Sequence, residues 1–186
     1  MAEITNYVQY FLRNNQFVIE GNWEESVEGK IEFKPRLKKN KKHCIYIWIA
    51  RKQDQIVPLY IGKARNGVFE RMGQHMGGFR EDKNGSVSGR RKRKILKKLL
   101  VSNWEVEIHS RDSRFLDSLE LVSKELFDFN TQKNENIKYP IVSLYSLEEE
   151  LLIRFFEENF PQITLLNGLK DSEVDPEEFL AKINDL

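Results

Sequence analysis

Five side chains between residues 46 and 75 carry the functional groups that act on a phosphate ester. They are two phenols, Tyr46 and Tyr60, and three basic groups, Lys63, Arg71 and His75. Arg71 and His75 are four residues apart, so they lie one above the other on a helix. A guanidinium fork suits phosphate oxygens, and an imidazole can bind such an oxygen or move a proton. With a tyrosine as general base, this spacing indicates hydrolysis of a phosphodiester.

Two short strands have to hold the tyrosines. Residues 44–50 alternate, so Ile45 and Tyr46 point to opposite faces, and residues 58–62 alternate in the same way. A turn centred near Gln53 would place Tyr46 roughly opposite Tyr60 on antiparallel neighbours. Both phenols are then expected to face one cleft. We expect Tyr46 to be the general base, with Lys63 as the nearby cation that lowers its pKa.

This pattern resembles the GIY-YIG nuclease family. The family signature is a Gly-Ile-Tyr strand, a Tyr-Ile-Gly strand and a helix that carries Arg with His or Tyr one turn later. The residues that match it are Tyr46, Tyr60, Gly62, Arg71 and His75. Cys44 departs from it, since the family usually has Gly there, but the functional atom of that strand is the Tyr46 hydroxyl. The resemblance covers residues 43–168.

The resemblance also implies one metal-binding Glu on a helix and an Asn further along the chain. Glu149 fits the spacing Glu-x-x-Leu-Ile best, with Glu148 and Glu150 as the alternatives. A single carboxylate completed by waters and phosphate oxygens suits Mg²⁺ or a similar ion such as Mn²⁺. Alternatively, Glu149 forms a capping box with Ser146 and only satisfies a helix terminus. Asn167 is either the implied catalytic Asn or a simple turn residue.

Length and composition favour one compact domain. A chain of 186 residues is long enough to bury a core of its own. Cys44 is the single cysteine, so no intramolecular disulfide can form, and a cysteine nucleophile is disfavoured. The sequence has neither a signal peptide nor an apolar run of membrane-spanning length. We therefore expect a cytoplasmic protein with no membrane partner.

The charges are segregated although the formal net charge is only +1. One basic run lies between residues 30 and 42, and a second, from Arg90 to Lys98, contains no acid. The second run predicts a helix whose cations follow a DNA backbone, the alternative being an ordinary solvated face. The residues that we assign to DNA contact are Lys92, Arg93, Lys97 and Lys98.

The predicted fold is α/β of the α+β type, with a small, mostly antiparallel central sheet flanked by helices. Residues 1–42 form an N-terminal extension that contains a helix over 3–19 and the basic run, with a break at Gly21-Asn22. Residues 43–168 form the nuclease-like core, with an inserted helix near 115–130. Residues 169–186 form an acidic tail, in which a short helix begins at Pro176.

The resemblance implies a divalent-metal-dependent endonuclease that hydrolyses double-stranded DNA. Among the members of the family, a stand-alone chain of this kind is similar to the type II restriction enzymes. The alternatives are a catalytically inactive DNA-binding module that keeps the nuclease fold, and a nuclease of the repair or homing type. A homodimer is left open.

Overall fold

The computed structural model describes residues 2–36, 43–81, 84–113, 144–167 and 175–185. Within them, five strands form one sheet in the order β2-β1-β5-β3-β4, and every neighbouring pair is antiparallel. The strands are β1 (Val18–Glu25), β2 (Ile31–Pro35), β3 (Cys44–Lys52), β4 (Gln55–Ala64) and β5 (Glu105–Asp112). The predicted α+β class with an antiparallel central sheet is confirmed.

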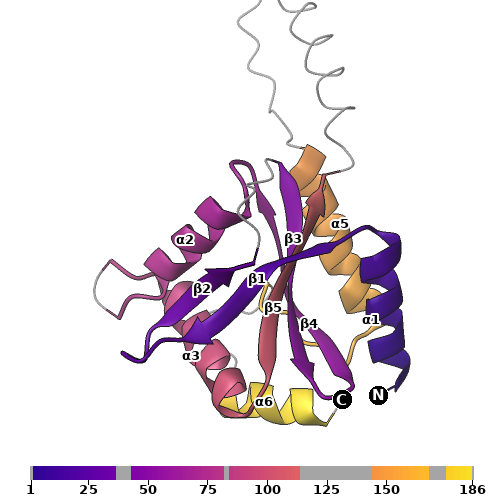
Figure 1. Cartoon of the computed structure of the whole chain (residues 1–186). Helices are drawn as coiled ribbons and strands as arrows, with labels where there is room; N and C mark the ends of the chain where they lie inside the picture. Colours follow the sequence, from indigo (N-terminus) through magenta and orange to yellow (C-terminus); the bar gives the residue numbers. More distant parts are fainter. Residues whose placement is uncertain (1, 37–42, 82–83, 114–143, 168–174, 186) are drawn as a thin grey trace, which may run out of the picture.

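Helices cover both faces of this sheet (Figure 1). They are α1 (Ala2–Asn14), α2 (Val68–Gly78), α3 (Val87–Val101), α5 (Leu144–Asn159) and α6 (Pro176–Asn184). On one face α1 and α5 pack together, with the rings of Phe11 and Phe156 5.2 Å apart. On the other face the α2 residue His75 lies 4.9 Å from the Trp48 ring of β3. The α6 helix packs against α3 and begins where the sequence predicts, after an N-cap at Asp175.

The β3–β4 hairpin sets the positions of the two tyrosines. Its tight turn pairs Lys52 with Gln55, and a bulge between Trp48 and Ile49 adds one residue, Leu59, on β4. Tyr46 therefore lies opposite Gly62, while Tyr60 lies opposite Trp48. The prediction that Tyr46 lies roughly opposite Tyr60 was off by two residues, because the turn is centred between Gln53 and Asp54 and the bulge adds one more residue. The two rings are diagonal neighbours on one face, 6.0 Å apart.

The N-terminal segment joins the same sheet. Gly21 and Asn22 lie inside β1, so the predicted break at this pair was wrong. Gly21 follows a bulge and is needed for a close approach, because a β carbon there would lie 2.3 Å from the carbonyl oxygen of Lys34. A glycine within a strand often marks such an approach. Residues 18–35 thus supply two of the five strands.

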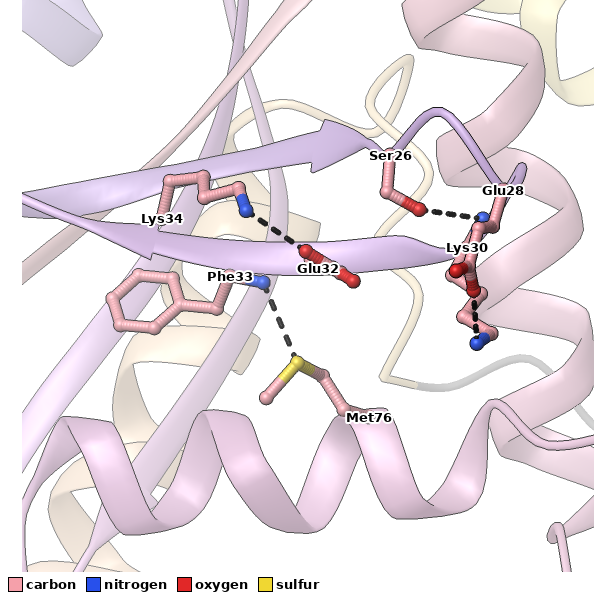
Figure 2. A network of polar contacts seen from close by, with 7 residues as sticks. All are labelled: Ser26, Glu28, Lys30, Glu32, Phe33, Lys34 and Met76. Atoms are coloured by element: carbon pink, nitrogen blue, oxygen red, sulfur yellow. Dashed lines mark hydrogen bonds and ion pairs between the residues drawn. The ribbon is translucent and has the colours of Figure 1, made fainter.

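Strand β2 is an edge strand, and helix α2 is fixed to it (Figure 2). The Phe33 N–H donates to the Met76 sulfur at 3.4 Å, and the Phe33 ring packs edge-on against Phe69 at 5.6 Å. Charged side chains such as Glu32 and Lys34, which pair with each other at 2.8 Å, occupy the exposed side of the strand. These contacts hold the helix that carries Arg71 and His75 across the sheet.

Some predicted features lie outside the described residues. They are the inserted helix near 115–130 and residues 37–42 of the first basic run. In the part of the chain that the structure describes, no helix is long and apolar enough to cross a membrane.

Candidate active site

The centre of the site is a hydrogen bond between Tyr46 of β3 and His75 of α2. The Tyr46 hydroxyl and the His75 Nε2 are 2.8 Å apart, and both side chains are buried. The phenol lies over Gly62, where an added β carbon would come within 2.3 Å of the hydroxyl oxygen. The glycine in the Tyr-Ile-Gly strand is therefore required for space. It lets the phenol pass over β4 and reach the helix.

Burial keeps both members of this pair uncharged. It raises the pKa of Tyr46 well above its ordinary value, and the neighbouring Tyr60 raises that pKa further against the opposing effect of Arg71. Burial, with help from Lys92 and Arg71, lowers the pKa of His75 to about 2. The expectation that Lys63 lowers the Tyr46 pKa was wrong, because the cation beside this phenol is Arg71 and desolvation outweighs it.

Arg71 lies against both phenols and presents part of its guanidinium without a partner. Burial alone would lower the pKa of Arg71, but the phenols of Tyr46 and Tyr60 hold it above its ordinary value. One terminal nitrogen donates to the Gln74 side chain at 2.7 Å. The buried Nε–H has no hydrogen-bond acceptor among the described residues. A buried donor left in this way favours an incoming anion.

Of the three acids in the Glu148–Glu150 run, Glu149 is the one near the tyrosines. Its carboxylate pairs with Lys63 at 3.1 Å, and its charge raises the pKa of Tyr60. Glu148 is buried instead in an ion pair with Arg111 and accepts a hydrogen bond from Ser113. Glu150 pairs with the exposed Arg154 of the next helical turn.

The capping-box alternative for Glu149 does not fit the helix. Helix α5 already includes Leu144, so Ser146 lies inside it rather than at the N-cap that a capping box needs. The Glu149 side chain is instead directed to Lys63 at the edge of the sheet. Its carboxylate therefore remains a candidate for chemistry.

Glu149 can contribute to a metal site of the open kind. No cluster of three or more His, Cys, Asp or Glu side chains occurs among the described residues. A site with one carboxylate, completed by phosphate oxygens and waters, is typical of Mg²⁺. Because Lys63 already partly neutralises Glu149, a bound cation would have to share the carboxylate with that ammonium. The residues present fit a single-carboxylate magnesium site.

Asn167 is bound to the backbone of the tyrosine strand. Its side-chain oxygen accepts from the Ile61 N–H at 2.8 Å, and its side-chain nitrogen donates to the Ile61 carbonyl at 2.5 Å. One residue earlier, the Leu166 N–H donates to the Leu59 carbonyl at 2.7 Å. Asn167 thus pairs with the edge strand β4 beside its bulge. These hydrogen bonds hold Tyr60 and Gly62, the neighbours of Ile61, in place.

The four cations assigned to DNA contact do not share one free surface. Arg93 pairs with Glu81, Lys97 with Glu25 at 3.0 Å, and Lys98 with Glu177 of α6. Lys92 lies within the site, with its Nζ 4.1 Å from the centre of the Tyr60 ring. The sequence assigned Lys92 to the helix surface because periodicity shows which residues share a face, but not what lies against that face.

Two hollows meet at Arg71. One, of about 210 Å³, lies toward Lys63 and Asn66, and the other, of about 190 Å³, lies toward His75, Ser86 and Lys92. Arg71 and Gln74 line both. The hollows carry cations on either side of Arg71, whose buried Nε–H has no acceptor among the described residues, and this arrangement suits a phosphate group.

Comparison with known proteins gives a distant likeness among solved structures. No protein-family model matches the chain, and no curated protein matches it either. Among solved structures, a mutant of bacteriophage T4 EndoII is similar with a TM-score of 0.44 and 20% sequence identity. That similarity covers 70% of this chain and 98% of the EndoII chain. The side chains of the site have to support any functional assignment by themselves.

Proposed function

We propose that this protein is a divalent-metal-dependent endonuclease of the GIY-YIG type that hydrolyses phosphodiester bonds in double-stranded DNA. The observation that carries the proposal is the hydrogen-bonded Tyr46–His75 pair at 2.8 Å, with Arg71 against the phenols. The carboxylate of Glu149 pairs with Lys63 on β4, the edge strand that also carries Tyr60. A hydrolase for phosphate esters needs these parts: a proton acceptor, a phosphate ligand and a ligand for a metal.

The neutral states of Tyr46 and His75 suggest how water is activated. A phenol with a raised pKa is a poor source of free phenolate at neutral pH. The pair can act as a relay instead, in which Tyr46 takes a proton from the attacking water and passes its own proton to His75 Nε2. The resulting imidazolium lies near Arg71 and Lys92, so the bound phosphate has to balance its charge.

The other residues position the phosphate and stabilise its charge. Arg71 offers the buried Nε–H to a phosphate oxygen, and its half-buried location strengthens that contact. A magnesium ion held by Glu149 would supply positive charge to the phosphate and to the leaving oxygen. Asn167 acts indirectly by fixing Ile61 between Tyr60 and Gly62.

A plasmid-cleavage assay with and without Mg²⁺ tests the function. We expect nicked and linear DNA only with the metal ion, and loss of cleavage in Glu149→Gln. Glu150→Gln is the matched control, because Glu150 is on the same helix and pairs with the exposed Arg154. Absence of cleavage by the parent protein with Mg²⁺ or Mn²⁺, together with tight DNA binding, would favour a non-catalytic DNA-binding module.

A fixed cleavage site would support a restriction-type enzyme. Mapping the ends of the products on a plasmid of known sequence separates that specialisation from a nuclease that cuts without sequence preference.

A further inference from the structure

Helix α3 comes unusually close to helix α2 beside the active site. A β carbon on Gly89 of α3 would lie 2.2 Å from the carbonyl oxygen of Gly78, at the end of α2. Ser86 caps α3 at the same place by accepting from the Gly89 N–H at 2.9 Å. Residues three apart on a helix share a face, so the contact at Gly89 directs Lys92 toward the site.

Lys92 differs in its surroundings from the three other cations of α3 that were assigned to DNA contact. Arg93, Lys97 and Lys98 each have a carboxylate partner. Within the described chain no acid forms an ion pair with Lys92, and its ammonium lies over the Tyr60 ring at 4.1 Å. It lines one hollow together with Arg71 and His75.

This location is unfavourable for a cation unless an anion joins it. Burial, and then the charge of Arg71, lower the pKa of Lys92 to about 8, while Glu149 opposes the change. The face of an aromatic ring compensates only part of such a loss of hydration. A lysine that served packing alone would extend its ammonium to open solvent, as long basic side chains usually do.

We propose that Lys92 is a further catalytic residue, whose ammonium binds the same phosphate as Arg71 across the hollow that both line. This inference rests on the proposed nuclease function. Lys92 then supplies charge in the transition state, while the Tyr60 ring limits where its ammonium can lie. The alternative is a structural cation–π contact that stabilises α3 and has no part in the reaction.

Cleavage by Lys92→Met separates these roles, since methionine keeps an unbranched apolar side chain but removes the charge. Loss of one preorganised charged contact typically costs about 10² to 10³ in rate. We therefore expect single-turnover cleavage to fall by about 10²-fold, with an unchanged melting temperature and with partial recovery in Lys92→Arg. Lys182→Met on α6 is the control, because its exposed ammonium pairs with Glu178 and has no assigned role, and it should cleave within a few-fold of the parent. A Lys92→Met enzyme as fast as the Lys182→Met control would overturn the inference.

A binding measurement makes the result independent of turnover. Lysines can be labelled by reductive ¹³C-methylation, and the Lys92 signal, assigned by its absence in Lys92→Arg, can be followed as inorganic phosphate is added. We expect that signal to shift in the parent and to respond less when Arg71 is replaced by Ala. An unmoved signal would contradict phosphate binding even if Lys92→Met were slow or poorly folded. A parent protein that cleaves no DNA but shows the shift would refute the nuclease function and leave the anion site standing.

Discussion

The phenolic oxygen of Tyr46 lies only 2.3 Å from the position that a β carbon on residue 62 would occupy, so Gly62 has to lack a side chain. The two residues face each other across the β3–β4 ladder, so strand pairing fixes their backbones. The Tyr46 ring can reach His75 only because residue 62 has no side chain. Glycine is thus a requirement of the site geometry at this position.

We expect Gly62→Ala to displace Tyr46 and to abolish its contact with His75. The result should be a clear fall in melting temperature and loss of cleavage, since a buried ring has to shift within a packed core. Thermal unfolding and single-turnover kinetics measure the two effects. Gly73→Ala is the control, because an added methyl there meets nothing within 4 Å. A helical Gly-to-Ala change should stabilise the protein by about 0.5–1 kcal/mol. A Gly62→Ala protein that retained stability and activity would show that the Tyr46 ring can adopt another position without loss of function.

The sequence predicted the strands and the two tyrosines on one face, but it did not predict how they come to share that face. With the observed turn, an unbroken ladder would pair Tyr46 with Ile61 and send the tyrosines to opposite sides. The extra residue at Leu59 shifts the register by one and restores a common face. Pro58 is the local signal, since proline within a sheet is confined to edges, strand starts and bulges. Periodicity alone does not reveal an insertion of one residue.

Contacts between distant elements account for the rest of what the sequence missed. The spacing Glu-x-x-Leu-Ile favoured Glu149 but left Glu148 and Glu150 as alternatives, and the three acids differ in what each contacts: Lys63, Arg111 and Arg154 respectively. Lys92 was grouped with its helix neighbours, although Gly89 within the helix carried a usable signal. Glycine inside a helical pattern often marks close packing, which here aims Lys92 at Tyr60.

Tyr46→Phe should impair the reaction far more than DNA binding. It deletes the hydroxyl of the proposed relay and keeps the ring over Gly62, and loss of a general base costs about 10² to 10⁴ in rate. The His75 nitrogen left without its partner should also lower stability, by about 1–3 kcal/mol. Single-turnover rates and DNA affinity are compared with those of Tyr10→Phe, whose parent side chain is exposed. A Tyr46→Phe rate within a few-fold of the parent would remove Tyr46 from the mechanism.

The two neighbouring acids on α5 should separate catalysis from stability. Glu149→Gln removes the proposed metal ligand near the surface, so we expect lost cleavage, weakened Mn²⁺ binding by electron paramagnetic resonance, and little change in unfolding free energy. Glu148→Gln leaves the buried Arg111 without its carboxylate. Breaking such a pair costs about 3–5 kcal/mol, measured by urea unfolding. If Glu148→Gln lost Mn²⁺ binding while Glu149→Gln kept it, the ligand would be Glu148.

His75 should make the protein less stable in acid. Its pKa in the folded state is lowered to about 2, so between that value and its unfolded value near 6.5 only the unfolded chain binds the proton. The loss of folding stability caused by His75 is therefore absent above the unfolded pKa. Below it, this loss grows as the pH falls, by up to about 1.4 kcal/mol per pH unit. Burial does most to lower the pKa of this imidazole, followed by the charges of Lys92 on α3 and Arg71 on its own helix. The phenols of Tyr46 and Tyr60 also face the ring.

Urea unfolding of the parent and of His75→Gln at a series of pH values tests this dependence. Glutamine cannot take up a proton, so its unfolding free energy should fall less steeply below the unfolded pKa of histidine, while carboxylates affect both proteins alike. The two curves should run parallel above that pH, which provides the internal control. Nuclear magnetic resonance of the imidazole should show a neutral ring throughout the stable range. Parallel curves down to acid, or a ring that takes up a proton near its ordinary pKa, would mean that His75 is hydrated and that the neutral Tyr46–His75 relay is wrong.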